Sequence, residues 1–459
     1  MSQGPGIEDQ VREALRLHQR GELAEAEQMY RQVLAADPHH ADALHLLGMI
    51  AYQTGREEDA AEWIGKAIAI NGNAAAYHSN LGNVLQSQGI IAEAGACYQR
   101  ALLLKPDLAE VHLNLGNIFK AQGELDSSLV CYRRALALNP ELAEAAVAES
   151  MALLLKGDFA SGWKSFERRW ETMEYETPMR AYPLPRWKGE QLRSGRLLLW
   201  GEQGIGDEVM FAGLIPDVLR SGNRCVLDCD ARLQPLFSRS FPGVEVVTGV
   251  AAGSHPELHL AAHLPSGSLP GRFRTSNADF AATTSPYLVA DPRAQRRFRA
   301  RYGDGRKLAG LAWHTRNQKT GRSRSMDLSL FAPLFALTGI RWISLQYGQP
   351  SDLQAQADAA GAPILIDHKV DQLADIDSFA AQIAAMDMVV TIDNSTAHLA
   401  GALGVATWVL LPFAPDWRWL QDREDSPWYP SIHLLRQPRI GDWQSVVQQL
   451  EGALRSETS

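Results

Sequence analysis

Apolar and small residues recur with a period of 34 along the first 170 residues, with polar positions between them. This period predicts two antiparallel helices in each unit, because small residues at a fixed phase let paired helices approach closely. Prolines at another phase end the second helix, since proline lacks an N–H group and clashes with the preceding turn. The phased positions are Gly21, Gly55, Gly89, Gly123 and Gly157; Leu47, Leu81 and Leu115, each followed by glycine; Ala26, Ala60 and Ala94; Tyr30, Tyr98 and Tyr132; and Pro38, Pro106 and Pro140.

A 34-residue helix pair is similar to the tetratricopeptide repeat. Four full units are predicted between about 7 and 142. A fifth, 143–172, has Glu149-Ser150 where other units have Leu-Gly, which is typical of a capping unit. Because one helix pair cannot bury its apolar face alone, we expect the units to stack into an α-solenoid with a concave groove, over residues 7–172.

Asn80 and Asn114 precede the Leu-Gly pair in two consecutive units, at a phase that points toward the concave face. An amide offers both a donor and an acceptor to an extended peptide. Eukaryotic O-GlcNAc transferases have a similar asparagine row, which holds acceptor protein. We therefore predict that Asn80 and Asn114 bind an acceptor. The alternative is that they cap or bridge neighbouring repeats.

Between 173 and 195 the helical period fades, and the segment contains three prolines and two glycines. This composition is typical of an extended linker. We expect Trp163, Trp170 and Trp187 to anchor it by packing against one of the domains.

From residue 196 apolar runs of strand length alternate with helical stretches, which predicts parallel sheets with right-handed crossovers. Two sets of strands predict two doubly wound, Rossmann-like lobes, 196–290 and 291–456, that face a cleft. Ligands of such sheets lie at the carboxyl ends of the strands. The predicted strands are 196–201, 224–230, 244–247, 308–314, 340–346, 364–367, 388–393 and 406–411.

The segment GEQGIGDE (201–208) follows the first of these strands and opens a helix. Gly204 and Gly206 let the backbone approach a ligand, and a helix N-terminus favours an anion. Asp207 and Glu208 lie in the first helical turn, where a carboxylate can accept the proton of an attacking hydroxyl. We predict a catalytic carboxylate in this pair, with Asp207 ahead of Glu208. The alternative is that Asp207 only caps the helix. The glycine spacing does not favour a dinucleotide site.

A second motif, WHTRNQKTGRSRS (313–325), follows the first strand of the second lobe and is basic in an otherwise acidic protein. At the carboxyl end of a strand, such side chains suit a diphosphate through charge-assisted hydrogen bonds. A solvated charged loop is the alternative. The basic residues are Arg316, Lys319, Arg322 and Arg324, and the first three are our candidates for donor binding.

A third motif, TIDNSTAHLAGALG (391–404), ends a strand at Asp393 and then enters a helix. Ser395, Thr396 and the backbone N–H groups there would cradle a phosphate, and Asp393 would fix sugar hydroxyls. His398 lies on the face toward the cleft, or else is a structural donor.

The run 411–437 is rich in tryptophan, proline and charge. Trp417, Arg418 and Trp419 would border the donor by stacking, or else pack between the lobes.

Hydrophobic residues make up 46% and charged residues 21% of the 459, an ordinary globular composition for two or three domains. The net charge of −9 argues against a nucleic-acid-binding protein. We see no signal peptide and no apolar run of the roughly 18 residues that a membrane span needs. Four cysteines do not make a disulfide framework. We expect a cytoplasmic protein.

The three motifs, in this order, resemble the bacterial heptosyltransferases, glycosyltransferase family 9. Members have a Gly-Asp turn, a basic loop and an Asp-Thr-Gly-x-x-His-Leu-Ala segment, which reads DNSTAHLA at 393–400. The resemblance covers about 196–450 and implies a GT-B fold without a metal at the Asp-Cys-Asp of 228–230. It assigns acceptor activation to Asp207, phosphate binding to Arg316 or Lys319, and donor binding to Asp393.

Repeats followed by a two-lobed transferase also resemble bacterial repeat-containing glycosyltransferases. This layout implies transfer of a sugar from a nucleotide-sugar to an acceptor hydroxyl on a protein held by the repeats, with no cofactor. One alternative is a non-catalytic scaffold with a transferase-like domain. Another is a sugar-nucleotide hydrolase or epimerase on the same fold.

Overall fold

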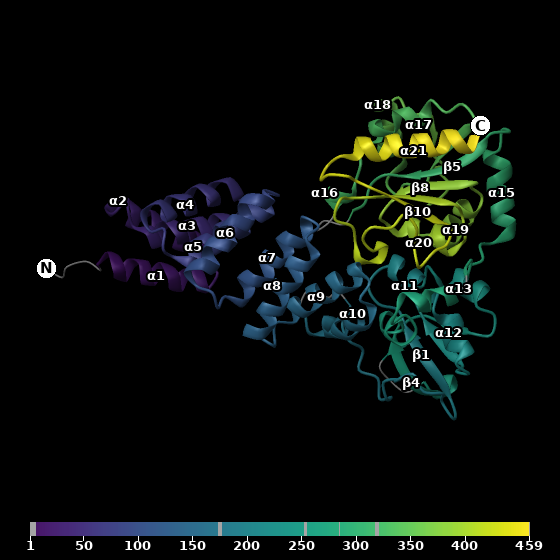
Figure 1. The fold of residues 1–459 in the computed structure, drawn as a ribbon, viewed down its shortest axis with the longest axis horizontal. Coiled ribbons are helices and arrows are strands. Elements are labelled where there is room, and N and C mark those ends of the chain that lie inside the picture. Colours follow the sequence, from purple (N-terminus) through teal and green to yellow (C-terminus); the bar gives the residue numbers. More distant parts are fainter. Residues whose placement is uncertain (1–5, 173–176, 252–254, 284, 317–320, 459) are drawn as a thin grey trace. The chain divides into compact units, whose positions relative to one another are not determined.

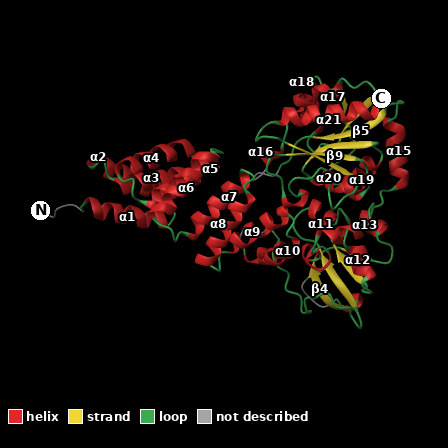
Figure 2. Cartoon of the chain, in the orientation of Figure 1, coloured by secondary structure: helices red, strands yellow, loops and turns green. Residues whose placement is uncertain are grey.

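A computed structural model of the chain describes residues 6–172, 177–251, 255–283, 285–316 and 321–458. Contacts between residues divide the chain into two compact units, 1–149 and 150–459. The described part of the first unit is helical, whereas the second combines helices with two parallel sheets (Figure 1, Figure 2). None of the helices in the described ranges has both the length and the hydropathy that crossing a lipid bilayer requires.

The first unit is built from helix pairs, as the 34-residue period predicts. Each pair has a first helix of 13 residues and a second helix of 14. The phased prolines follow the second helices directly, as expected. The helices are α1 (Ile7–Gln19), α2 (Leu23–Ala36), α3 (Ala41–Gln53), α4 (Glu57–Ile70), α5 (Ala75–Ser87), α6 (Ile91–Leu104), α7 (Ala109–Ala121) and α8 (Leu125–Leu138).

The phased glycines fill two roles. Gly55 and its equivalents adopt a left-handed backbone with φ near +77°, which ends the first helix of each pair. Gly82 lies against the Tyr98 ring, so that a Cβ there would be 2.6 Å from Cε1. The close approach of paired helices that the sequence predicts is therefore confirmed.

The helix pair expected as a fifth repeat crosses the boundary between the units. It consists of α9 (Ala143–Lys156) and α10 (Phe159–Phe166), followed by the 3₁₀ helix η1 (Glu167–Glu171). Within the second unit, Trp163 Nε1 donates to the Arg274 carbonyl over 2.8 Å. Phe159 packs against Phe280 with ring centroids 4.9 Å apart. The last repeat helix is thus built into the α/β unit.

The first sheet has the order β3-β2-β1-β4, and all its ladders are parallel. The chain moves outward from β1 to β3 and then returns to place β4 on the other side of β1. Helices cover one face, whereas Leu198 and Trp200 on the other face pack with Tyr182 of the linker. The elements are β1 (Arg196–Trp200), β2 (Cys225–Asp228), β3 (Glu245–Val247), β4 (Leu260–Pro265), α11 (Ile205–Ala212), α12 (Ile215–Arg220), α13 (Gln234–Ser240) and α14 (Pro270–Phe273).

The tryptophans near the linker anchor it as predicted. Trp170 packs against Trp200 of β1 with ring centroids 5.5 Å apart. Trp187 is fully buried, and its backbone N–H donates to the His263 carbonyl of β4 over 2.9 Å. The linker therefore covers a sheet face that helices leave open.

The second sheet has the order β10-β9-β8-β5-β6-β7, again with parallel ladders only. Helices α17, α18 and α21 cover one face, and α19 and α20 lie on the other (Figure 1). The strands are β5 (Lys307–Ala312), β6 (Ile340–Ser344), β7 (Ile364–Leu365), β8 (Met388–Ile392), β9 (Thr407–Leu411) and β10 (Ile432–Arg436). The helices are α15 (Pro292–Tyr302), α16 (Gly321–Arg324), α17 (Ala332–Phe335), α18 (Pro350–Ala359), α19 (Ile376–Ala384), α20 (Ser395–Ala402) and α21 (Trp443–Thr458).

All eight predicted strands are present, but β4 and β10 were not predicted. Both lie at the edge of their sheets, and neither is buried along its whole length. A strand that is partly exposed does not produce a continuous apolar run.

Candidate functional site

The candidate site lies where the strand order of the second sheet reverses. This reversal falls between β5 and β8, and ligands of parallel sheets bind at such points, beyond the carboxyl ends of the strands. Asp393 directly follows β8, and Arg324 ends α16 after β5. Arg324 Nη1 lies 2.9 Å from Asp393 Oδ2. Two predicted segments therefore meet at the reversal point.

Five charged side chains form a continuous series there, which we call the Asp–Arg network: Asp207, Arg418, Asp416, Arg324 and Asp393. Arg324 Nη2 lies 3.3 Å from the second carboxylate, Asp416. Asp416 Oδ1 accepts from Arg418 Nη1 over 2.6 Å. Arg418 Nη2 in turn donates to Asp207 Oδ1. The network thus joins the second sheet to α11 of the first lobe.

Local structure sets the positions of Asp207 and Asp416 in the network. Gly204 is the N-cap of α11, so Asp207 is the third residue of that helix. The interpretation of Asp207 as the N-cap is therefore wrong. Asp416 caps the 3₁₀ helix η6 (Trp417–Trp419), where its side chain accepts from the Arg418 backbone N–H over 3.2 Å.

Neighbouring charges set the ionisation of the network. Burial raises the pKa of Asp393 above its ordinary value, and the Arg324 guanidinium opposes the rise. Burial also acts to raise the pKa of Asp416, but Arg418 and Arg324 outweigh it and lower that pKa to about 2. Asp416 therefore stays ionised and holds two guanidinium groups side by side.

The first turns of α11 and α20 touch beside this network. A Cβ at Gly206 would lie 3.0 Å from His398 Cδ2, so only glycine permits this approach. His398 is buried, stacks on Trp419 with centroids 5.4 Å apart, and lies 2.9 Å from the Tyr429 hydroxyl. Burial lowers the pKa of His398 to about 3, so the ring is neutral. His398 therefore packs and hydrogen-bonds within the fold, in line with the alternative prediction of a structural donor.

The expected phosphate cradle at the start of α20 is not present in this form. Asn394 Oδ1 already accepts from the backbone N–H groups of Thr396 and Ala397, over 2.9 and 3.4 Å. Thr396 is fully buried, and Gly206 packs over Ser395. The prediction for Thr396 is corrected for this physical reason: its amide is capped and its hydroxyl is enclosed. Phosphate binding by Ser395, which is half-buried, stays a prediction.

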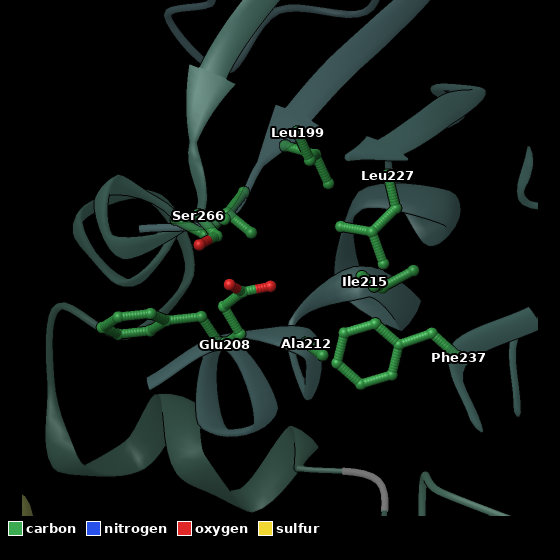
Figure 3. A pocket seen from close by; sticks show the side chains of 10 residues that line it. Leu199, Glu208, Ala212, Ile215, Leu227, Phe237 and Ser266 are labelled. Atoms are coloured by element: carbon green, nitrogen blue, oxygen red, sulfur yellow. The ribbon is translucent and has the colours of Figure 1, made fainter. Parts of the chain in front are cut away.

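Glu208 faces away from Asp207, into the core of the first lobe. Figure 3 shows its carboxylate pointing between Leu199 and Ser266. Its Oε2 accepts from the Asp230 backbone N–H over 3.0 Å, and desolvation raises its pKa to about 7. The adjoining cavity of about 10 Å³ has room for one water at most. The prediction of a catalytic Glu208 is therefore corrected, because its carboxylate does not reach the Asp–Arg network.

The basic loop contributes a different arginine from those predicted. Arg316 is exposed, and its guanidinium lies 5.6 Å from the Tyr347 ring centroid. Lys319 lies outside the described residues, and of Arg322 only the backbone, in α16, is described. Arg324, named in the motif but not among our donor-binding candidates, is the one that reaches Asp393.

The other candidate residues have structural partners. Asn80 Nδ2 lies 2.8 Å from His45 Nε2, and Asn114 Nδ2 donates to Asn83 Oδ1 over 3.0 Å. Both amides thus bridge neighbouring repeats, which was the alternative prediction. Trp417 packs against Trp163, so the tryptophan run serves packing.

The Asp-Cys-Asp segment is engaged in ion pairs. Asp228 Oδ2 lies 2.5 Å from Arg180 Nη1, and Asp230 pairs with Arg232. Within the described ranges, no three His, Cys, Asp or Glu side chains are grouped so that they could hold a metal ion.

Solved structures similar to the chain cover about a third of it. MamA is 24% identical, covers 34% of this chain and 91% of its own, and has a TM-score of 0.32. PilF of Pseudomonas aeruginosa is 23% identical over 35% of this chain and 75% of its own, with a TM-score of 0.33. MamA of Desulfovibrio magneticus is 16% identical over 35% and 90%, with a TM-score of 0.32.

Sequence families match the N-terminal third of the chain. The tetratricopeptide repeat family matches residues 17–83 and 109–142, and the TPR repeat family matches 87–123. Protein FlbA of Caulobacter vibrioides is 31% identical over 326 residues, which cover 67% of this chain and 54% of FlbA. The chain thus spans about half the length of this curated relative, and the similarity extends beyond the repeats. The N-terminal part of the chain therefore consists of tetratricopeptide repeats, and an α/β part with parallel sheets follows it.

Proposed function

We propose that the chain is a metal-independent glycosyltransferase of the GT-B type, which moves a sugar from a nucleotide-sugar to an acceptor hydroxyl. The observation that carries this proposal is the Asp–Arg network. It brings two guanidinium groups and the Asp207 carboxylate together at the reversal point of a parallel sheet. Guanidinium groups bind diphosphates, and a carboxylate accepts protons.

The order of the strands supports a nucleotide at this point. Counted within the second sheet, the order is 3-2-1-4-5-6, the order of doubly wound nucleotide-binding sheets. The first sheet follows its first four members, 3-2-1-4. Two lobes of this type, joined through Asp207 and Arg418, support the GT-B proposal.

The proposed reaction balances with the groups present. The acceptor oxygen attacks the anomeric carbon of the donor sugar, and its proton passes to Asp207. The bond from that carbon to the diphosphate breaks, and the diphosphate leaves with the electron pair. Arg324 and Arg418 lie where they would stabilise this developing negative charge.

The second part of the proposal concerns the acceptor and is based on the repeats. Stacked helix pairs form extended concave surfaces that bind other proteins. The last of these helices, α10, is built into the α/β unit through Trp163. We therefore propose that the acceptor is a protein held by the repeats.

Calorimetric titration of UDP, ADP, GDP and CMP tests the donor site first. We expect micromolar binding of one nucleotide, lost in Arg324→Ala. The matching labelled nucleotide-sugar is then incubated with the protein and a bacterial protein extract. We expect label in an acceptor protein, and a loss of at least 100-fold in Asp207→Asn.

Asp304→Asn is the matched control, because Asp304 pairs with Arg306 on the surface, outside the network. It should bind and transfer like the wild type. If no nucleotide binds, the scaffold function replaces the proposal. Rapid release of sugar into water without an acceptor would instead identify a hydrolase.

A further inference from the structure

We propose that Arg418 is a ligand for which two anions compete: the Asp207 carboxylate in the free protein, and the diphosphate of the bound donor. Donor binding would then release Asp207 for the acceptor. The inference rests on the proposed function, because it takes a nucleotide-sugar as the donor.

The guanidinium of Arg418 is already engaged on its outer edge. Nη1 donates to Asp416 Oδ1 over 2.6 Å, and Nη2 donates to Asp207. One face of the group lies 4.5 Å from the Trp417 ring centroid. A guanidinium carries its donors in a fixed planar fork. Two of its five N–H donors point at carboxylates, and a diphosphate oxygen that takes the place of Asp207 at Nη2 would displace that carboxylate.

Asp207 is the partner that can leave. Asp416 is two residues from Arg418, accepts from the Arg418 backbone N–H, and also holds Arg324. Asp207 is hydrogen-bonded to the network through Arg418 and comes from the other lobe, 211 residues away in the sequence. Asp416 makes three contacts, two to Arg418 and one to Arg324, whereas displacing Asp207 breaks one contact between the lobes.

Neighbouring residues hold Arg418 in its position between Asp416 and Asp207. Trp417 packs against Trp163 of α10, with centroids 5.2 Å apart. Trp419 stacks on His398 of α20. Because both flanking residues are fixed, Arg418 can change partner by a side-chain rotation while η6 stays in place.

The exchange has a consequence for the reaction. While Arg418 holds Asp207 Oδ1, the carboxylate is oriented toward the guanidinium rather than toward an acceptor. Displacement by a diphosphate would free both carboxylate oxygens and let the side chain turn to the acceptor hydroxyl. Donor before acceptor is therefore the expected order of binding.

The test is calorimetric titration of the nucleoside diphosphate that the wild-type protein binds. If Asp207 and the diphosphate compete, Asp207→Asn should bind it more tightly, by about fivefold or more. The same variant should lose transfer activity. If Asp207 only contacted the ligand, its removal would lower both the diphosphate affinity and the transfer activity. A higher affinity together with a lower activity therefore distinguishes competition from a structural role.

A double-mutant cycle assigns the gain to Arg418. Asp207→Asn should increase affinity in the wild-type background but not in Arg418→Ala. A gain in both backgrounds would overturn the inference, because removal of any negative charge would explain it. Asp207→Ala repeats the measurement, and circular dichroism verifies that each variant is folded.

The outcomes separate the two proposals. If the wild type binds none of the nucleotides, the proposed function fails. If it binds one and Asp207→Asn binds no more tightly, the competition at Arg418 is refuted while the proposed function stands.

Discussion

The two parallel sheets of the α/β unit place an arginine and a carboxylate where their strand order reverses, but at different depths. In the first sheet, Arg169 and Glu202 are both 0% exposed and form a bidentate pair with bonds of 2.9 and 3.0 Å. In the second, the Arg324 side chain is 18% exposed and that of Asp393 is 4% exposed. The same type of ion pair is fully buried in the first sheet, whereas in the second sheet its arginine is partly exposed.

The sealed pair is closed by further hydrogen bonds. Glu202 Oε1 also accepts from the Gly267 backbone N–H over 2.6 Å. Ser268 Oγ accepts from both Arg169 and Arg186, each over 3.0 Å. Arg169 comes from η1, at the end of the repeat helices. The repeat end thus occupies the point where ligands of the first sheet would bind, whereas the Arg324 side chain at the same point of the second sheet is partly exposed.

The largest expected effect is that of Arg169→Ala on the unfolding of the α/β unit. Removal of one partner leaves the Glu202 carboxylate buried without its charge partner, which costs about 3–5 kcal/mol. We expect a fall of that size in the free energy of unfolding by urea. Arg168→Ala is the matched control, because the Arg168–Glu171 pair is partly exposed. Equal effects of the two substitutions would contradict the sealed role of Arg169.

The second expected effect concerns Glu208, which lies near the same edge. Its folded pKa of about 7 exceeds its ordinary value of 4.5, so the folded protein keeps a proton that the unfolded chain releases. Stability should therefore fall as pH rises from about 4.5 to 7 and then level off. Glu208→Gln removes this cost and should stabilise the protein by about 3 kcal/mol at pH 8.

Thermal unfolding at pH 5 and pH 8 tests the effect of Glu208→Gln. The gain should be present at pH 8 and small at pH 5, because Glu208 is then protonated in the folded wild type. Glu257→Gln is the control, since the side chain of Glu257 is largely exposed. A gain in stability of equal size at both pH values would mean that a difference in packing, rather than the buried charge, makes Glu208→Gln more stable than the wild type.

Local pattern was enough to predict most of the fold and only part of the site. The 34-residue period predicted the helix pairs, and apolar runs predicted eight strands. Asp207 and Asp393 were predicted because each lies next to a strand or helix end, where ligands of parallel sheets bind. Arg418 and Asp416 were not predicted as partners of Asp207. The bond between Arg418 and Asp207 joins residues 211 positions apart, and no local pattern encodes such a pairing.

Arg324→Ala should have a smaller effect on stability than Arg169→Ala, because water reaches the Arg324 side chain. We expect about 1–2 kcal/mol in the free energy of unfolding. The loss of nucleotide affinity should be tenfold or more, since charge-assisted hydrogen bonds to phosphate are removed. Calorimetry and urea unfolding of the same sample measure both. A large loss of stability with unchanged affinity would make the second pair structural like the first.

The smallest expected effect is that of Arg306→Ala. It adds to the comparison a third arginine–carboxylate pair, which is more exposed than the other two. Arg306 pairs with Asp304 just before β5, and the two side chains are 46% and 31% exposed. Solvent screens such a pair, and the ordering of two long side chains opposes the remaining attraction. We expect urea unfolding and nucleotide binding to match those of the wild type.

If Arg306→Ala weakened nucleotide binding as much as Arg324→Ala, the loss would reflect the net charge of the lobe rather than a contact at the reversal point. The graded series Arg169, Arg324 and Arg306 therefore separates burial from charge, because each variant removes the same guanidinium from a different depth.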